Sequence, residues 1–585
     1  MGLVPRPSVD GQDHVEWWFE RRHESFIDSH TGEVVRSKPW LAAVSALYIA
    51  TYRRVLRASI DAMHQSPTVQ DGMTAGSVPD DPRSWEILLY RFANALAGEY
   101  VHHSIIMSNA ISGAKDRLVL PARLRYERPA TYRHFQRNVA TSHSALSPLV
   151  AVAAAAELKG SQEVPVEVIL APDRRIARSF NAIARTVRGR RLREVETLLR
   201  TAIPSPPDVV LMSPFLDPAR MSTALWGAEV RRFPTISSEL LDLECSPSVV
   251  LPTSDGALGW LVARLLPSEY LLGYPTLMRM LQNSGHPRPR KAVVASFLPD
   301  VAHQAYVIDA VRNGRRFVLL QHGSAYGLAA DHAYSDIEIS IADSFGAWGW
   351  SEVRAHRKTF DIPMARDASR WPEILARPMS LRGSTRMVEI RYVVSDPFTS
   401  ARQMRGWTRR VSNEADARTF LQHLRDIHRM SGVLHVRPRG KGRYEPDAPE
   451  WAWHLGARVV EGARELWGEE ACKDVVVLDS LLTTVLPEVL VAGNRVIVAM
   501  PDWRDVIHES FHYLMDRLEH AGLLFECFRS AADRAVEIAR MDPAEIDGLM
   551  AAWQPLRRRI AGVDVGLDGL RRAVLGSAIL GDTQR

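Results

Sequence analysis

Short runs of β-branched and aliphatic residues alternate with helical segments through most of the chain after about residue 160, and this alternation limits the fold more than any other feature. Buried parallel strands have this composition because helices cover both faces of their sheet. A strand, a helical crossover of a dozen or more residues and a second strand form the βαβ unit. The sequence therefore predicts the α/β class.

Two successive series of such units are visible. The first predicts strands at Val166–Ala171, Asp208–Ser213, Ala292–Phe297 and Arg316–Leu320, and the helical pattern of Pro299–Asn313 is long enough to join the last two strands as a parallel crossover. The second series predicts strands at Val388–Val394, Val433–Val436, Val475–Asp479 and Arg495–Met500. Its predicted helices are Asn413–Met430, Ala457–Trp467 and Thr483–Ala492.

The regions outside these series complete the predicted organisation. Apolar residues recur at helical spacing in Lys38–His64 and Arg83–Ser108, so we expect a helical N-terminal region. A polar, Pro-rich stretch after Asp361 suits a linker. We therefore predict an α/β protein with two Rossmann-like domains, divided into residues 1–160 (helical region), 161–360 (first domain), 361–385 (linker), 386–545 (second domain) and 546–585 (helical tail).

Composition restricts the function classes. Lys and Arg number 73 against 68 Asp and Glu, and a net charge of +5 on 585 residues without a recognisable module does not indicate a nucleic-acid partner. The 3 cysteines show no metal-ligand spacing, which fits a reducing cytoplasm. Without an apolar core near the N-terminus or a long apolar run, we expect no secretory signal, and any membrane contact would be peripheral.

The sharpest local motif is a buried strand that ends in a polar, Gly-flanked turn, with the sequence Gln321-His322-Gly323-Ser324-Ala325-Tyr326-Gly327. A histidine there can act as a base near neutral pH, and the loop N–H groups could hold an oxyanion or phosphate. A histidine that only caps the strand through a backbone hydrogen bond is an equally good interpretation. Downstream, Asp343 and Trp350 belong to an aromatic cluster that could form a sugar platform, although packing is the more frequent use of such clusters.

Two further motifs follow predicted strands of the second series. Arg437, Arg439 and Lys441 could clamp a diphosphate, or form a solvated basic loop. The strand Val475–Asp479 is followed by hydroxyl and acidic side chains that could bind a phosphate and a sugar or ribose hydroxyl, while the threonines could equally be N-caps: Ser480, Thr483, Thr484 and Glu488.

Motifs of several other enzyme classes are missing from the sequence. It contains no GxxxxGK[ST], HExxH or GxSxG pattern and no GxGxxG after a first strand, and its histidines show no metal-ligand spacing. We therefore expect no metal site and no bound cofactor.

With these residues in hand, the chain resembles a family of transferases encoded in bacterial loci for surface carbohydrates, namely lipopolysaccharide, O-antigen and capsule. The resemblance covers about Ala292 to Phe528. It rests on the pattern His322-Gly323-x-x-Tyr326-Gly327, on Asp343-x-Phe345-x-x-Trp348-Gly349-Trp350, and on Thr483-Thr484 with Glu488 and Asn494. The Gln321-His322-Gly323 element also looks like that of capsule Kdo transferases and of enzymes that polymerise glycerol phosphate.

The resemblance implies a GT-B-like fold and a nucleotide-activated donor, and we expect the first domain to form the acceptor side and the second to bind the donor. It implies that His322 lies at the reaction centre as general base or as cationic partner of the leaving phosphate, and that Arg437, Arg439 or Lys441 holds the donor phosphates. Our own hypothesis adds that Ser480, Thr483 and Thr484 bind the same phosphates, and that Glu488, counted with His322 among the catalytic residues, fixes sugar or ribose hydroxyls. Gln321, Gly323, Ser324, Tyr326, Gly327, Asp343 and Trp350 would form the acceptor side.

The resulting hypothesis is a cytoplasmic, metal-independent glycosyltransferase whose partners are a nucleotide-sugar and a surface glycan or its lipid-linked precursor. Basic and aromatic residues near the N-terminus, such as Trp17, Trp18 and Arg21, could dock it on an anionic inner membrane leaflet. Two alternatives stay open. One is a nucleotide-sugar epimerase or polyol-phosphate transferase on the same scaffold, and the other is a non-catalytic glycan-binding or assembly protein.

Overall fold

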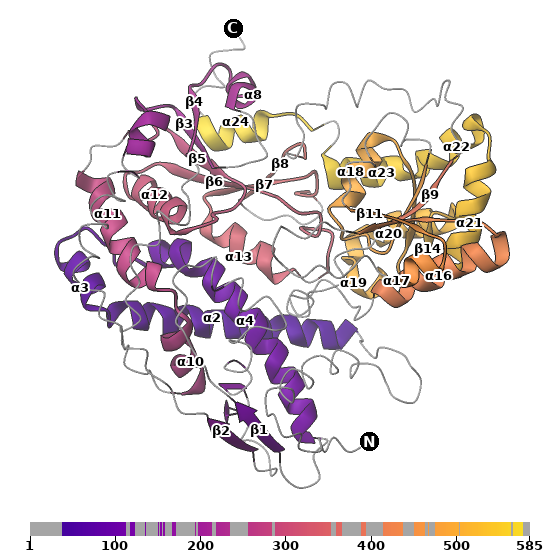
Figure 1. The fold of residues 1–585 in the computed structure, drawn as a ribbon. Helices are drawn as coiled ribbons and strands as arrows, with labels where there is room; N and C mark the ends of the chain where they lie inside the picture. Colours follow the sequence, from indigo (N-terminus) through magenta and orange to yellow (C-terminus); the bar gives the residue numbers. More distant parts are fainter. Residues whose placement is uncertain are drawn as a thin grey trace.

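A computed structural model describes residues 38–112, 118–122, 135, 150, 153–154, 156–157, 166–170, 194, 197–212, 218–234, 256–283, 287–330, 332–352, 358–364, 388–393, 413–436, 450–461, 466, 474–501, 503–562 and 565–576. These residues form a mixed α/β protein with two six-stranded parallel sheets and a helical N-terminal region (Figure 1). The predicted α/β class and the helical N-terminal region are confirmed.

The N-terminal region contains helices α2 (Lys38–His64), α3 (Pro67–Thr74) and α4 (Pro82–Ser112), of which α2 and α4 pack against each other. A two-stranded parallel sheet pairs β1 (Leu118–Ala122) with β2 (Val166–Leu170). The predicted strand at Val166–Ala171 therefore exists, but its partner is β1, and it does not belong to the first six-stranded sheet. Local composition predicts that a segment is a strand but not which strand it pairs with.

The first six-stranded sheet has the order β4-β3-β5-β6-β7-β8. Its strands are β3 (Val209–Met212), β4 (Val230–Arg232), β5 (Ala292–Ala295), β6 (Arg316–Leu320), β7 (Ser344–Ala347) and β8 (Thr359–Asp361). The helices between them are α8 (Pro218–Ala224), α10 (Ala257–Leu265), the π-helix η3 (Glu269–Gly273), α11 (Tyr274–Asn283), α12 (Val301–Arg312) and α13 (Ala333–Ile341).

Helices cover both faces of this sheet, which explains its continuous apolar strands. In β6, Phe317 and Leu319 share a buried cluster with residues of α12, whereas Val318 and Leu320 share another with α24 (Asp568–Leu575). Alternate side chains of a strand point to opposite faces, so each face needs its own cover. The C-terminal helix α24 thus returns to the first sheet, as Figure 1 shows.

The second six-stranded sheet has the order β11-β10-β9-β12-β13-β14. Its strands are β9 (Ile390–Val393), β10 (Val433–Val436), β11 (Arg458–Glu461), β12 (Val475–Leu478), β13 (Arg495–Ala499) and β14 (Leu524–Phe525). The accompanying helices are α16 (Asn413–His428), α17 (Glu450–His454), α18 (Val485–Ala492), α19 (Trp503–Val506), η7 (Glu509–Phe511), α20 (His512–His520), α21 (Phe528–Arg540), α22 (Pro543–Met550), η8 (Ala551–Trp553) and α23 (Gln554–Ala561).

One predicted element of this half is wrong. The helix expected at Ala457–Trp467 is in part the strand β11, because Arg458–Glu461 pairs with β10 at the edge of the sheet. Two valines between charged residues suit an edge strand, which has fewer neighbours than a central strand. The predicted strands β6 and β10 agree residue for residue with the structure.

The predicted linker begins inside the first sheet. Asp361 closes β8, and the backbone N–H of Met364 donates a 3.0 Å hydrogen bond to the carbonyl of Ala561. The rest of the predicted linker, residues 365–385, lies outside the described residues. None of the helices in the described part of the chain is both long and apolar enough to cross a membrane.

Candidate functional site

The loop that contains His322 leaves β6 at the carboxyl edge of the first sheet, the edge at which its parallel strands end. Gln321 holds this loop through both ends of its amide. Its Oε1 accepts hydrogen bonds from the backbone N–H of Trp348 (2.8 Å) and from the indole Nε1 of Trp350 (2.6 Å), and its Nε2 donates to the carbonyl of Gly323 (2.6 Å). These hydrogen bonds of Gln321 therefore fix the start of the loop against the segment that contains Trp348 and Trp350.

Gly327 lets the loop approach the Trp350 ring. Its φ is +72°, which side chains with a Cβ rarely adopt, and a Cβ there would lie 2.2 Å from Cδ2 of the ring. Steric contact and backbone conformation therefore both require glycine at this position.

The side chains of His322, Tyr326 and Glu338 form a small polar cluster beside the loop. The Tyr326 hydroxyl donates a 2.5 Å hydrogen bond to Oε2 of Glu338 and lies 3.2 Å from Nδ1 of His322. Glu338 is fully buried on α13, and its Oε2 is 3.9 Å from the same imidazole nitrogen. Since the hydroxyl proton points to the carboxylate, the Tyr326 oxygen can accept a hydrogen bond from the ring and so orient it.

The electrostatic surroundings keep His322 neutral. Its ring contacts the Phe297 ring at 5.9 Å between centroids, and the guanidinium of Arg91 lies 5.7 Å from the centroid of the same phenyl ring. Burial, together with the positive charge of Arg91, lowers the pKa of His322 to about 4, while a backbone hydrogen bond with Ser296 acts in the opposite direction. A neutral imidazole keeps one nitrogen lone pair, which is the form that a general base requires.

The His322 loop touches the second half of the chain directly after strand β12. The Ser324 hydroxyl donates a 2.7 Å hydrogen bond to the carbonyl of Leu482. A Cβ on Gly323 would lie 3.9 Å from Cγ2 of Thr484. The backbone N–H of Leu482 in turn donates to the hydroxyl of Ser480 at 3.1 Å. The structure thus brings together two predicted motifs that are about 160 residues apart in the sequence.

A second set of backbone contacts fastens the other end of this loop. The N–H of Ala330 donates to the carbonyl of Val506 (2.8 Å), and the N–H of His508 donates to the carbonyl of Leu328 (2.9 Å). Both ends of the loop are therefore bonded to residues that follow strands of the second sheet.

The remaining predicted residues of the second sheet lie at the start of α18. Thr484 is the N-cap without a side-chain capping bond, and the hydroxyl of Thr483 accepts from the N–H of Val485 at 3.3 Å. Glu488 is buried in the first turn, and Ser480 is buried before it. Ser480, Thr483 and Thr484 therefore share the carboxyl edge with the His322 loop.

Asp343 does not share this edge, which corrects its assignment to the acceptor side. Its carboxylate accepts a 2.8 Å hydrogen bond from the N–H of Phe317 and pairs with Arg83 at 2.7 Å. Phe317 lies at the start of β6, whereas His322 follows its end, so the strand separates the two residues. Asp343 directly precedes β7, and its contacts with Phe317 and Arg83 stabilise the amino edge of the sheet. Arg437, Arg439 and Lys441 lie outside the described residues.

Two residues of the site were missed in the sequence analysis. Glu338 is a single carboxylate in the apolar run Ile337–Ile341, and this isolated charge was a usable signal. Arg91 lies on α4 and reaches the site only because α4 packs beside the first sheet, where its Nη1 donates to the carbonyl of Leu298 at 2.8 Å. Nothing in the sequence around Arg91 distinguishes it from other arginines in helices, so the sequence offered no signal for it.

Comparisons with known proteins bear on the part of the chain that forms this site. No curated protein and no solved structure matches the chain. The model of a family described as LIC12162 family transferase matches residues 257–542, a range that contains the His322 loop, strands β5 to β14 and helix α18. Over this range the protein is similar to a family of transferases, and the match supports an enzyme of that class.

Proposed function

We propose that the protein is a glycosyltransferase of the GT-B type, which moves a sugar from a nucleotide-activated donor to a surface glycan or its lipid-linked precursor. One observation carries the proposal: the hydrogen bond from Ser324 to Leu482 joins the carboxyl edges of the two parallel sheets. Ligands of open α/β sheets bind outside the carboxyl ends of the strands. Two such edges in contact suit a reaction with two substrates.

The strand orders support two Rossmann-like domains. Counted from β9, the second sheet has the order 3-2-1-4-5-6, which is that of dinucleotide-binding folds. Counted from β3, the first sheet begins 2-1-3-4-5, as in flavodoxin-like folds, and adds one strand. In the second sheet the order reverses between β9 and β12. Asp479 and Ser480 follow β12 at that point, where a nucleotide is expected.

In this proposal His322 is the general base. A ring nitrogen takes the proton of the acceptor hydroxyl as its oxygen forms the new bond to the anomeric carbon, and the nucleotide leaves with the electron pair of the broken glycosyl–phosphate bond. Tyr326 and Glu338 position the ring. The pKa of about 4 favours the base over the cationic role for His322.

The donor phosphates would be held by Ser480, Thr483 and Thr484 with the N-terminus of α18, and Glu488 would bind sugar or ribose hydroxyls. Arg437, Arg439 and Lys441 would neutralise the phosphate charge without a metal; this assignment rests on the resemblance. We also propose that the enzyme works in the cytoplasm, docked by its basic and aromatic N-terminal residues on the inner membrane leaflet.

Nucleotide binding is the first test. The melting temperature of the wild-type protein is measured with CMP, CDP, UDP, GDP and dTDP, and the screen is repeated on Arg437→Ala and on Arg517→Ala, an exposed arginine of α20. We expect one nucleotide to raise the melting temperature of the wild type and of Arg517→Ala but not of Arg437→Ala. No shift with any nucleotide in a folded sample would contradict the proposal.

Turnover is the second test. With a sugar donor built on the nucleotide so identified, we expect His322→Ala to lose product formation while it keeps nucleotide binding. A variant that retains wild-type turnover would exclude His322 as the base. Epimerised donor without acceptor, or transfer of a polyol phosphate, would identify the alternative enzymes. Binding of glycan without turnover by the wild type would identify a glycan-binding protein.

A further inference from the structure

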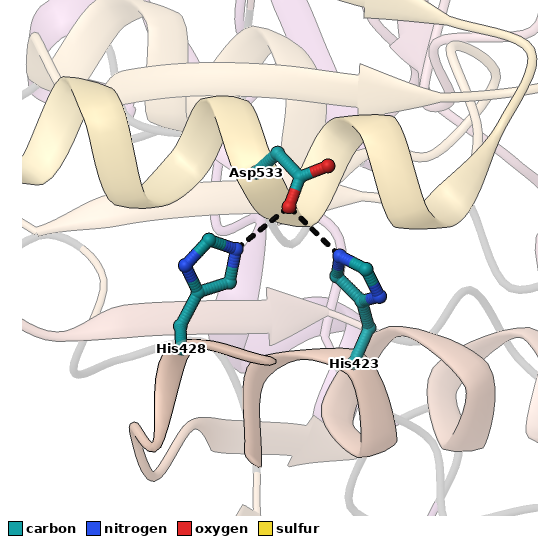
Figure 2. Close-up of side chains that lie close together, drawn as sticks. All are labelled: His423, His428 and Asp533. Atoms are coloured by element: carbon teal, nitrogen blue, oxygen red, sulfur yellow. Dashed lines mark hydrogen bonds and ion pairs between the residues drawn. The ribbon is translucent and has the colours of Figure 1, made fainter. Parts of the chain in front are cut away.

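Two histidines and one aspartate meet between helices α16 and α21, away from the candidate site. His423 and His428 lie on α16, and Asp533 lies on α21 (Figure 2). The Nε2 atoms of both rings approach the same oxygen of Asp533, at 2.7 Å from His423 and 2.6 Å from His428. One donor atom from each residue lies within 4.8 Å of the other two.

The helices hold these side chains in place. α16 and α21 pack against each other on the second sheet, and the side chains of His423 and His428 are only 17% and 19% exposed. The Asp533 side chain is half exposed, so the cluster is open to solvent on one side. The cluster is therefore preformed and accessible.

The donor set and its spacing suit a transition-metal ion. Two imidazole nitrogens and one carboxylate oxygen are ligands that zinc takes at about 2.0–2.2 Å, often with water as the fourth ligand. Tetrahedral coordination separates such donors by about 3.3 Å. The oxygen of Asp533 would have to withdraw from the rings by about 0.7 Å, a small change for a half-exposed side chain.

The position of the cluster at the C-terminal end of α16 also favours a bound cation. His428 is the last residue of α16, and Arg429 after it has a positive φ of +53°, which ends the helix. The C-terminal end of a helix carries partial negative charge and favours a cation there. The carboxylate of Asp533 contributes a further negative charge.

We propose that His423, His428 and Asp533 bind a zinc ion that fastens the C-terminal turn of α16 to α21. This site goes beyond the proposed transfer reaction and departs from the expectation of no metal site that the sequence alone suggested. α16 ends shortly before β10 begins, so its last turn lies toward the amino edge of the second sheet, opposite to the edge with Ser480 and Thr483. The ion would stabilise the second sheet and its helices and would not take part in transfer.

The test uses full-length protein without an affinity tag, stripped of metal with a chelator. Zinc is titrated in competition with a chromophoric chelator, and cobalt is titrated separately because its absorption spectrum reports tetrahedral coordination. The variants are Asp533→Asn and His428→Gln, and the matched control is His520→Gln, an exposed histidine of α20 whose Nδ1 bonds to the carbonyl of Asp516. Circular dichroism verifies that each variant is folded.

We expect the wild type and the control to bind one zinc per chain and to melt at a higher temperature with zinc. Asp533→Asn and His428→Gln should each weaken binding by at least about tenfold and lose the zinc-dependent rise. Equal affinity of Asp533→Asn and the wild type would overturn the proposal. A wild type that binds no zinc would also overturn the proposal. If Asp533→Asn then lowers the melting temperature, the cluster is only a hydrogen-bonded contact between two helices.

Discussion

The side-chain oxygen of Gln321 accepts a 2.6 Å hydrogen bond from the indole nitrogen of Trp350, 29 residues away. The N–H of Trp348 donates to the same oxygen, so one amide ties the start of the His322 loop to the segment after β7. The conformation of the loop therefore depends on residues of the segment after β7 as well as on residues of the loop itself.

Replacement of Gln321 by leucine should destabilise the protein. Gln321→Leu removes the acceptor of two N–H groups, and each donor left buried without a partner costs about 1–3 kcal/mol. We expect the free energy of unfolding in urea to fall by at least about 2 kcal/mol. The matched control is Gln70→Leu on the surface of α3, which should change it by no more than about 0.5 kcal/mol. Equal effects would show that the Gln321 bonds contribute nothing to stability.

Gly327 offers a paired test of backbone strain and steric contact. Gly314 has a similar φ, +74° against +72°, but a Cβ there would meet no atom within 4 Å. Gly314→Ala should therefore cost only the strain, about 1–2 kcal/mol, whereas Gly327→Ala must also displace the Trp350 ring. We expect Gly327→Ala to lower the melting temperature clearly more than Gly314→Ala. A similar loss of melting temperature in both variants would mean that the Trp350 ring moves aside without a measurable cost in stability.

Tyr326 and Glu338 should be energetically coupled. Tyr326→Phe removes the hydroxyl that donates to the buried carboxylate and should cost about 1–3 kcal/mol. In Tyr326→Phe/Glu338→Gln the acceptor of this hydrogen bond is replaced as well, so the loss should be smaller than the sum of the two single losses. Urea unfolding of the four proteins measures the coupling. Strictly additive losses would contradict an interaction between the two side chains.

The lowered pKa of His322 predicts how stability depends on pH. Above about pH 6.5, the ordinary pKa of histidine, His322 is neutral in both states and its titration contributes nothing. Between about pH 6.5 and 4 the unfolded chain binds the proton and the folded protein does not, so stability falls as the pH falls. Relative to His322→Gln, the wild type should lose up to about 2–3 kcal/mol across this window.

This difference is measured by urea unfolding of both proteins at several pH values, because other groups that titrate in the window affect both equally. A wild-type minus variant difference that stays constant from pH 7 to pH 4.5 would show that the folded-state pKa of His322 is not lowered.

Most helices and central strands could be predicted because their signal is local. The runs Arg316–Leu320 and Val433–Val436 are buried strands in the structure, as their β-branched and aliphatic composition indicates. Edge strands such as β11 and β8 carry a weaker signal. Half of their surroundings is solvent, so charged residues are tolerated and the apolar pattern is diluted.

Parts of the candidate site were predictable in the same way. The His322 loop and the segment Ser480–Thr484 each follow a predicted strand, and the structure confirms that each lies at the carboxyl edge of its sheet. Asp343 was misplaced because its proximity in sequence to Trp350 was taken as proximity in space. A residue before a strand and a residue after it lie at opposite edges.

The sequence by itself determined the α/β class, the helical N-terminal region and the positions of the polar turns, since each depends on side chains within a few residues of one another. Only the tertiary structure decided that Ser324 meets Leu482, that Arg91 reaches the surroundings of His322, and that Asp533 lies between two histidines of α16. These contacts join residues roughly 100 to 230 positions apart. They depend on how helices and sheets pack against one another, and the local pattern of residues does not predict that packing.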